Sequence, residues 1–248
     1  MKDETGWRYY NYEDELVTSG WAHDRKGLVW LNADGYWDER TGWVDDHGEK
    51  YYIKDGYRQS STWLKERSGW RYLGSDGRLV RNRWVKDRVG WVYLNANGYW
   101  VNRTGWMKVK EEWYYLKSGY RQDNTWLRDR VGWCYAGSNG RLIKNGWAED
   151  SIGWCWLNKN GYWVKRRWIQ YRGEWYYLKA NGYMAANEWA RDSRGWMWMN
   201  GSGKITKNRW IKYKGYWYYL KANGYMATGR QTINGKVYRF YSSGKWIE

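Results

Sequence analysis

Large aromatic side chains recur in a fixed order along the chain, separated by short polar and glycine-containing segments. One tryptophan returns every 20 to 22 residues, from Trp21 to Trp210. In most units a second aromatic residue follows it by seven residues and a third by nine, and a glycine such as Gly98 closes the unit. Because internal repeats of this length indicate repeat architectures, we interpret residues 21–229 as about ten similar units of 20–22 residues.

Each unit predicts a β-hairpin. A short strand follows the first tryptophan, a polar turn such as residues 87–90 reverses the chain, and a second strand such as residues 113–116 alternates its faces. A glycine-containing loop such as residues 95–98 leads to the next unit. One two-stranded hairpin is barely stable in water, so the hairpins must bury their faces against each other. The predicted fold class is therefore all-β, a solenoid of β-hairpin repeats.

A longer repeat period, of 63 residues, spans three of the 20–22-residue units. Trp37, Trp100 and Trp163 are each 63 residues apart, and residues 20–82, 83–145 and 146–208 look like three copies of a three-hairpin unit. This period predicts about three hairpins per turn of the solenoid, and duplication of a block without structural meaning is the alternative. We expect a single repeat domain over residues 1–248, with a half-hairpin cap at 1–20 and a capping hairpin at 230–248.

Composition adds two expectations. The chain holds 26 Trp and 26 Tyr but one Phe and no Pro. Because Trp and Tyr carry a polar tip on a large apolar body, this choice predicts aromatic surfaces as well as a core. The formal net charge of +17 favours an anionic partner, such as nucleic acid, an acidic membrane or a wall polymer. Solubility of such aromatic repeats is the alternative reason for the charge.

Residues 210–229 carry a pattern that resembles the choline-binding, cell-wall-binding repeat of Gram-positive surface proteins, autolysins and phage endolysins. The pattern is a Trp-Tyr-Tyr-Leu strand at 217–220 followed by Gly-Tyr-Met at 224–226, and residues 168–184 match equally well. Residues 232–238 resemble the terminal hairpin of such modules, so the resemblance covers nearly the whole chain. It implies a left-handed solenoid that acts as a noncatalytic binding module at the extracellular cell-wall surface.

The resemblance also implies a ligand, the choline or phosphocholine of teichoic acids. It would lie between consecutive hairpins, in a cage of two tryptophans from one repeat and an aromatic residue from the next, often closed by a methionine. A quaternary ammonium donates no hydrogen bond, so aromatic faces hold it through cation–π attraction and desolvation. Carried over by position, the best cages group Trp168, Trp175 and Tyr177 with Met184, and Trp210, Trp217 and Tyr219 with Met226.

Other positions fit the same pattern less completely, and sequence does not assign which Tyr of a Tyr-Tyr pair faces the cage. The methionine position holds Arg58 and Arg121, whose charge would repel choline, and Lys50 replaces a cage tryptophan. We therefore expect ligand sites mainly in the C-terminal third. The further candidate ligand-binding residues are Trp84, Trp91, Trp106, Trp113, Tyr115, Trp126, Trp133, Trp147, Trp154, Trp189, Trp196 and Trp198.

An enzyme is not expected. His23 and His47 lie near predicted turns without further metal-ligand spacing, so we expect no metal and no cofactor. Acidic residues that recur three positions after the first tryptophan, as Asp129 and Asp150 do, indicate turns rather than a catalytic pair. Two cysteines, Cys134 and Cys155, occupy equivalent positions in adjacent hairpins, where we expect free thiols.

Three alternatives to choline binding remain. Sugars also stack on tryptophan, so binding of a glucan or wall glycan is one, and an engineered or structural solenoid scaffold without a ligand is another. Nucleic acid is the third, although basic residues are spread over every repeat and predict only nonspecific binding. Residues 1–5 hold no apolar run and no 18-residue apolar stretch occurs, so we expect neither a signal peptide nor a membrane span in this sequence. A homodimer through the terminal hairpins is a hypothesis that the resemblance suggests.

Overall fold

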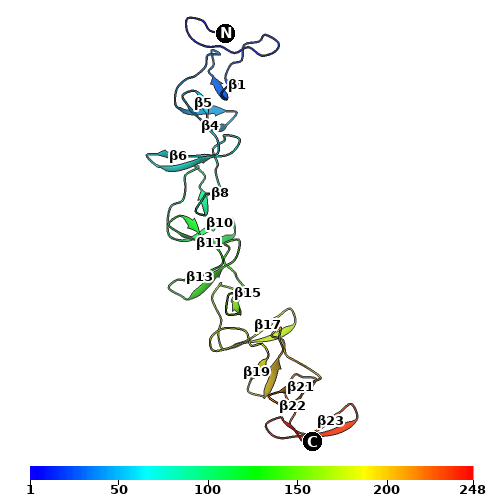
Figure 1. Cartoon of the computed structure of the whole chain (residues 1–248). Helices are drawn as coiled ribbons and strands as arrows, with labels where there is room; N and C mark the ends of the chain where they lie inside the picture. The colour runs from blue at the N-terminus through cyan, green and yellow to red at the C-terminus, as the bar shows by residue number, and fades with distance from the viewer. Residues whose placement is uncertain (248) are drawn as a thin grey trace. The chain divides into compact units, whose positions relative to one another are not determined.

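The computed structural model describes residues 1–247 as a succession of short antiparallel strands (Figure 1). The strands are β1 Gly20–His23, β2 Leu28–Leu31, β3 Gly42–Asp46, β4 Glu49–Lys54, β5 Tyr57–Arg58, β6 Thr62–Glu66, β7 Gly69–Leu73, β8 Arg83–Lys86, β9 Trp91–Leu94, β10 Gly105–Val109, β11 Glu112–Lys117, β12 Tyr120–Arg121, β13 Thr125–Arg128, β14 Trp133–Ala136, β15 Gly146–Glu149, β16 Trp154–Leu157, β17 Arg167–Tyr171, β18 Glu174–Leu178, β19 Glu188–Arg191, β20 Trp196–Met199, β21 Arg209–Tyr213, β22 Tyr216–Leu220, β23 Gly229–Ile233, β24 Lys236–Phe240 and β25 Trp246–Ile247. Within this part of the chain, no helix is long and apolar enough to cross a membrane.

The strands pair as the repeat predicts, and the all-β hairpin-repeat solenoid is confirmed. In β17–β18, for example, Trp168 lies opposite Tyr177, and in β21–β22 Trp210 lies opposite Tyr219. The hairpin β23–β24 closes the series, and β25 pairs with β24. The chain divides into two compact units, residues 1–107 with 115–122, and residues 108–114 with the chain from 123 onward.

A column of apolar side chains forms the core of both units. It is contributed by the residue ten positions after each first tryptophan, where the second strand ends. These side chains are at most 1% exposed, so the column supplies most of the deeply buried apolar volume. Its members are Leu31, Ile53, Leu73, Leu94, Leu116, Ala136, Leu157, Leu178, Met199 and Leu220.

Backbone hydrogen bonds tie each hairpin to the loop after the next one. The amide of Met184, which follows the hairpin β17–β18, donates to the carbonyl of Trp154 in β16 at 2.7 Å. The amide of Trp163 donates in the same way to Trp133, and that of Met226 to Trp196. Consecutive hairpins therefore share one register, which places the side chain at the Met184 position beneath the second tryptophan of the preceding hairpin.

The closing glycine of each unit makes room for that side chain. Gly203 has φ +76°, in the left-handed region, and a Cβ atom there would lie 2.3 Å from the sulfur of Met184. Gly182 has φ +89°, and a Cβ atom there would lie 2.5 Å from the ring of Trp163. Because both the backbone conformation and the space exclude a side chain, glycine is required where consecutive repeats touch.

A repeated tyrosine–aspartate hydrogen bond, the tyrosine latch, joins the turn of one hairpin to the loop that follows the next hairpin. The hydroxyl of Tyr183 donates to Asp150, 33 residues earlier, at 2.8 Å, and the same spacing recurs from Tyr162 to Asp129 and from Tyr225 to Asp192. Burial alone would raise the pKa of Asp150, but donors that include the Trp126 indole and the Tyr183 hydroxyl outweigh it and lower the pKa. Burial, together with the bond to Asp150, raises the pKa of Tyr183 to about 12. The repeated acidic residues are thus structural, as the sequence predicted.

Replacing Tyr183 by phenylalanine tests this latch. The variant is expected to lose about 1 kcal/mol of unfolding free energy, because a partly buried hydrogen bond to a charged acceptor is broken while Asp150 keeps its other donors. Urea unfolding followed by circular dichroism measures the loss. Tyr12→Phe is the control, since Tyr12 is fully exposed and should give no change. Equal stability of the two variants would contradict a stabilising latch.

Two kinds of turn occur among the hairpins from β13 to β22. In β13–β14, β15–β16 and β19–β20, the side chain of an aspartate accepts two backbone amides, as Asp192 does from Arg194 and Gly195. In β17–β18 and β21–β22, a two-residue turn with positive φ at both positions replaces it, at Arg172-Gly173 and Lys214-Gly215. The hairpins with the two-residue turn carry tyrosine instead of aspartate just before it, at Tyr171 and Tyr213.

Cys134 and Cys155 are buried free thiols, which confirms the sequence prediction. The Cys155 thiol donates to the carbonyl of Ala148 at 3.3 Å. Burial raises the pKa of both thiols to about 12. Since the thiolate is the reactive form, neither cysteine is suited to nucleophilic or redox chemistry in the folded protein.

Candidate ligand-binding site

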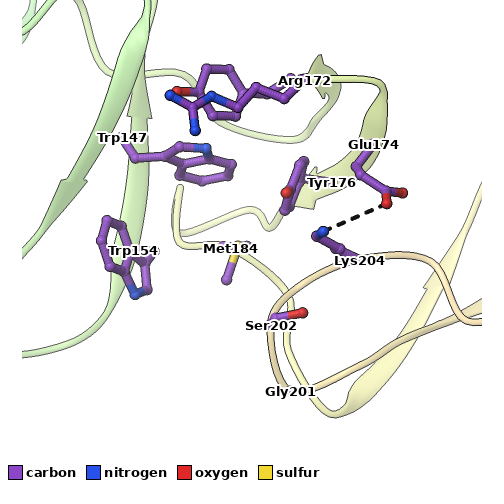
Figure 2. Close-up of a pocket in the computed structure, with 10 residues that line it drawn as sticks. Trp147, Trp154, Arg172, Glu174, Tyr176, Met184, Gly201, Ser202 and Lys204 are labelled. Carbon is purple, nitrogen blue, oxygen red and sulfur yellow. Dashed lines mark ion pairs between the residues drawn. The ribbon is translucent and has the colours of Figure 1, made fainter.

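An aromatic pocket opens between the hairpins β15–β16 and β17–β18 in the second unit. Figure 2 shows Trp147, Trp154 and Tyr176 around it, with Met184 at its base. The cavity volume is about 440 Å³. Tyr171, at the end of β17, completes the aromatic lining.

The walls of this pocket stand at steep angles to one another. The ring centroids of Trp147 and Trp154 are 6.5 Å apart with an interplanar angle of 87°, and those of Trp147 and Tyr176 are 5.0 Å apart at 67°. A hydrogen bond from the Met184 backbone amide to the Trp154 carbonyl holds Met184 next to these rings. The pocket therefore presents several ring faces toward one small volume, and Trp154 remains 42% exposed at its mouth.

An equivalent pocket lies 42 residues further along, between β19–β20 and β21–β22. It is lined by Trp189, Trp196, Tyr213, Tyr218 and Met226, with a cavity volume of about 240 Å³. The centroids of Trp189 and Tyr218 are 5.1 Å apart, and Met226 donates its amide to the Trp196 carbonyl at 2.8 Å. We call the two pockets the Met184 cage and the Met226 cage.

Charged groups also line the Met184 cage. The Arg172 guanidinium carbon lies 5.2 Å from the Tyr171 centroid, and the Lys204 ammonium pairs with Glu174 at 3.5 Å (Figure 2). In the Met226 cage the ammonium of Lys214 lies 5.4 Å from Tyr213. The ring faces of the lining suit a cation that donates no hydrogen bond, and its basic groups suit an anion attached to that cation.

The structure corrects the grouping that the sequence suggested. Met184 was expected with Trp168, Trp175 and Tyr177, but it lies against the tryptophans of the preceding hairpin. The reason is the register between consecutive hairpins, because the backbone amide of Met184 donates its hydrogen bond to the carbonyl of Trp154 in the preceding hairpin. Met226 likewise joins Trp189 and Trp196 rather than Trp210, Trp217 and Tyr219.

The residue at the third aromatic position packs on the first tryptophan of its own hairpin and does not line either cage. Tyr177 packs on Trp168 of its own hairpin at 4.9 Å, and Tyr219 on Trp210 at 5.3 Å. The neighbouring residues Tyr176 and Tyr218 face the preceding hairpin instead, since side chains alternate along a strand. Trp198 and Tyr115 pack on Trp189 and Trp106 in the same intrahairpin way.

Trp168 and Trp175 line a different pocket, between the two cages in sequence. It holds Ile205 in place of the methionine and Asp192 in place of the tyrosine at the turn, together with Arg194. Its cavity volume is about 490 Å³. Asp192, Arg194 and Lys207 bring charge to this pocket, and a single pair of tryptophans supplies most of its aromatic lining.

Other predicted tryptophan pairs are occupied by the chain itself. The ring centroid of Trp163 lies 4.7 Å from that of Trp126, and its amide donates to the carbonyl of Trp133, while Tyr238, Phe240 and Trp246 surround Trp210. The guanidinium of Arg121 lies over both Trp84 and Trp91. Trp113 accepts the amide of Leu142, Trp106 packs on Tyr115, and Trp217 is 41% exposed beside Lys212.

Four tyrosines of the cages were missed by the sequence analysis. Tyr176 and Tyr218 were not distinguished from their neighbours, and the turn residues Tyr171 and Tyr213 were not considered. A signal for the latter exists, because the position three residues after the first tryptophan is acidic in most hairpins and tyrosine only at 171 and 213. Within residues 1–247, no group of three or more acidic, histidine or cysteine side chains could hold a metal ion.

Four segments match a family model described as "Putative cell wall binding repeat": residues 41–56, 104–119, 167–184 and 208–226. The last two end at Met184 and Met226, so each cage takes its methionine and tyrosines from a matched repeat. No curated protein sequence matches the chain.

Solved structures resemble the fold. The modular autolysin LytC from Streptococcus pneumoniae, in complex with a synthetic peptidoglycan ligand, aligns with a TM-score of 0.53 and 25% identity over 92% of this chain and 52% of that one. The chain thus spans about half the length of LytC. CbpF in complex with ipratropium aligns with a TM-score of 0.52 and 23% identity over 90% of this chain and 76% of that one, which shows the fold alone.

Proposed function

We propose that this chain, an array of cell wall binding repeats, is a noncatalytic module that binds choline or phosphocholine of wall teichoic acids through the Met184 and Met226 cages. The observation that carries the proposal is the recurrence, 42 residues apart, of two tryptophans, two tyrosines and a methionine around one small cavity. Each cage takes its methionine and its two tyrosines from a segment that matches the cell wall binding repeat model.

The chemistry of the cages supports a quaternary ammonium. A trimethylammonium group presents methyl groups and a diffuse positive charge, and ring faces stabilise both without a hydrogen-bond acceptor. Each ring contributes about 0.5–2 kcal/mol, so a cage of this kind gives a dissociation constant on the order of millimolar. Two cages on one chain gain avidity on a polymer that carries many cholines.

The basic residues of the lining favour the phosphate ester of choline over free choline. Phosphocholine carries a phosphate next to its quaternary ammonium, and Arg172 and Lys204, the latter paired with Glu174, line the Met184 cage together with its aromatic rings. The formal net charge of +17 adds long-range attraction to an anionic wall polymer. A location at the extracellular wall surface and a homodimer formed through the terminal hairpins belong to the same proposal, and sedimentation with and without choline tests the dimer.

A thermal melt in choline chloride tests the proposal, with sodium chloride at equal ionic strength as control. At a choline concentration about 100 times the dissociation constant, each cage should add about 2.7 kcal/mol to the unfolding free energy. A rise in melting temperature beyond the salt control is the expected result. No such rise would overturn the proposal and make glycan binding the next candidate, with the pocket at Trp168 and Trp175 the first place to look.

A further inference from the structure

The residue at the methionine position decides what fills each tryptophan pair. In the second unit Met184 and Met226 leave cavities next to their tryptophans, whereas Trp163 at the same repeat position fills the space beside Trp126. In the first unit two repeats carry arginine at this position, Arg58 and Arg121, and the others carry Trp37, Leu79 and Trp100. These two arginines place a positive charge at the methionine position, next to the tryptophans of the preceding hairpin.

Arg121 lies in β12, which pairs with β9 through Tyr120 and Val92. Its guanidinium carbon lies 5.2 Å from the ring centroid of Trp84 and 5.1 Å from that of Trp91. Both distances are within the range of a cation–π contact. A positive charge that belongs to the chain thus faces the same two repeat positions as Trp147 and Trp154 in the Met184 cage.

Arg58 provides an internal comparison. Its guanidinium carbon lies 5.7 Å from Trp21, but Leu28 stands where the second tryptophan would be. The same substitution in the same repeat position therefore faces one ring instead of two.

We propose that Trp84 and Trp91 form a third cation cage, and that the guanidinium of Arg121 is its built-in ligand. A tethered ligand acts at an effective concentration on the order of millimolar or higher, so it competes with a free ligand of comparable weak affinity. External quaternary ammonium is excluded from this cage while Arg121 is present, and enters when an uncharged side chain replaces it. The inference rests on the proposed function, since it takes the quaternary ammonium as the ligand of the open cages.

The variant Arg121→Met tests the inference, with Arg58→Met as the matched control. The slope of unfolding free energy against RT ln[choline] at saturation counts the sites that bind only the folded protein. This slope should rise from about two in the unchanged protein to about three in R121M, and stay at about two in R58M. Methionine occupies the equivalent position at 184 and 226, so R121M is expected to fold.

The outcomes separate the two proposals. A zero slope in the unchanged protein refutes the proposed function, whereas an equal slope in R121M and the unchanged protein, or an equal gain in R58M, overturns the third cage. The reciprocal variant Met184→Arg gives a second measurement that does not depend on the folding of R121M. It should lower the slope by about one, and an unchanged slope would refute the role of the charge at this position.

Discussion

Choline no longer raises the melting temperature once Trp154 and Trp196 are both replaced by alanine; this is the largest functional effect that we expect. Each substitution removes one ring face from the mouth of a cage and leaves the neighbouring hairpin contacts in place. A loss of up to about 2 kcal/mol per cage weakens binding up to about 30-fold, which moves a millimolar site beyond practical concentrations. Thermal melts and calorimetric titration of the double variant with choline measure the loss.

Trp133 is the matched control for this experiment. It occupies the same repeat position and is 41% exposed, against 42% for Trp154 and 41% for Trp196, but Trp163 stands at the methionine position of this pair and packs on Trp126 at 4.7 Å. Trp133→Ala should therefore keep the choline response of the unchanged protein. Retention of the response in the double variant, or its loss in W133A, would show that choline binds elsewhere.

The largest effect on stability is expected from the apolar column, at Leu157→Ala. Leu157 is fully buried, and it packs in a cluster with Cys155, Ala148 and Tyr135. Truncation of such a leucine removes transfer free energy and leaves a cavity, which costs about 2–5 kcal/mol. Denaturant unfolding followed by tryptophan fluorescence measures the difference.

Ile152→Ala controls for the loss of an aliphatic side chain from the same hairpin. Ile152 lies in the turn between β15 and β16 and is 72% exposed, so its truncation should change the unfolding free energy by less than about 0.5 kcal/mol. If L157A and I152A were equally stable, the column would not be the main source of stability in the second unit.

The hairpins, their turns and the repeat can be predicted from the sequence alone. Alternation in strands, the aspartate and glycine of each turn and the aromatic spacing act over a few residues, so they can be read without knowing the fold. The turn at residues 87–90 illustrates this, since Asp87 accepts the amides of Val89 and Gly90. The hand of the solenoid and the three hairpins per turn remain predictions.

Only the tertiary structure decided which aromatic residues meet. The cages depend on the register between consecutive hairpins, which is set by bonds such as that from Met184 to Trp154, 30 residues apart. A shift of one repeat in the assumed register assigned Met184 to Trp168 and Trp175, and no local pattern distinguishes the two registers. The same holds for Tyr176 against Tyr177, because alternation shows that they face opposite ways but not which one meets the preceding hairpin.

The effect of the Arg121 charge also depends on the tertiary structure. The sequence shows an arginine where a methionine was expected, and from that alone it predicts repulsion of a cationic ligand. Packing places its guanidinium against two indole rings at once, so that attraction to the rings holds it in the cage. Short-range patterns thus fix the elements of this protein, and contacts between residues about 30 apart in the chain fix its binding sites.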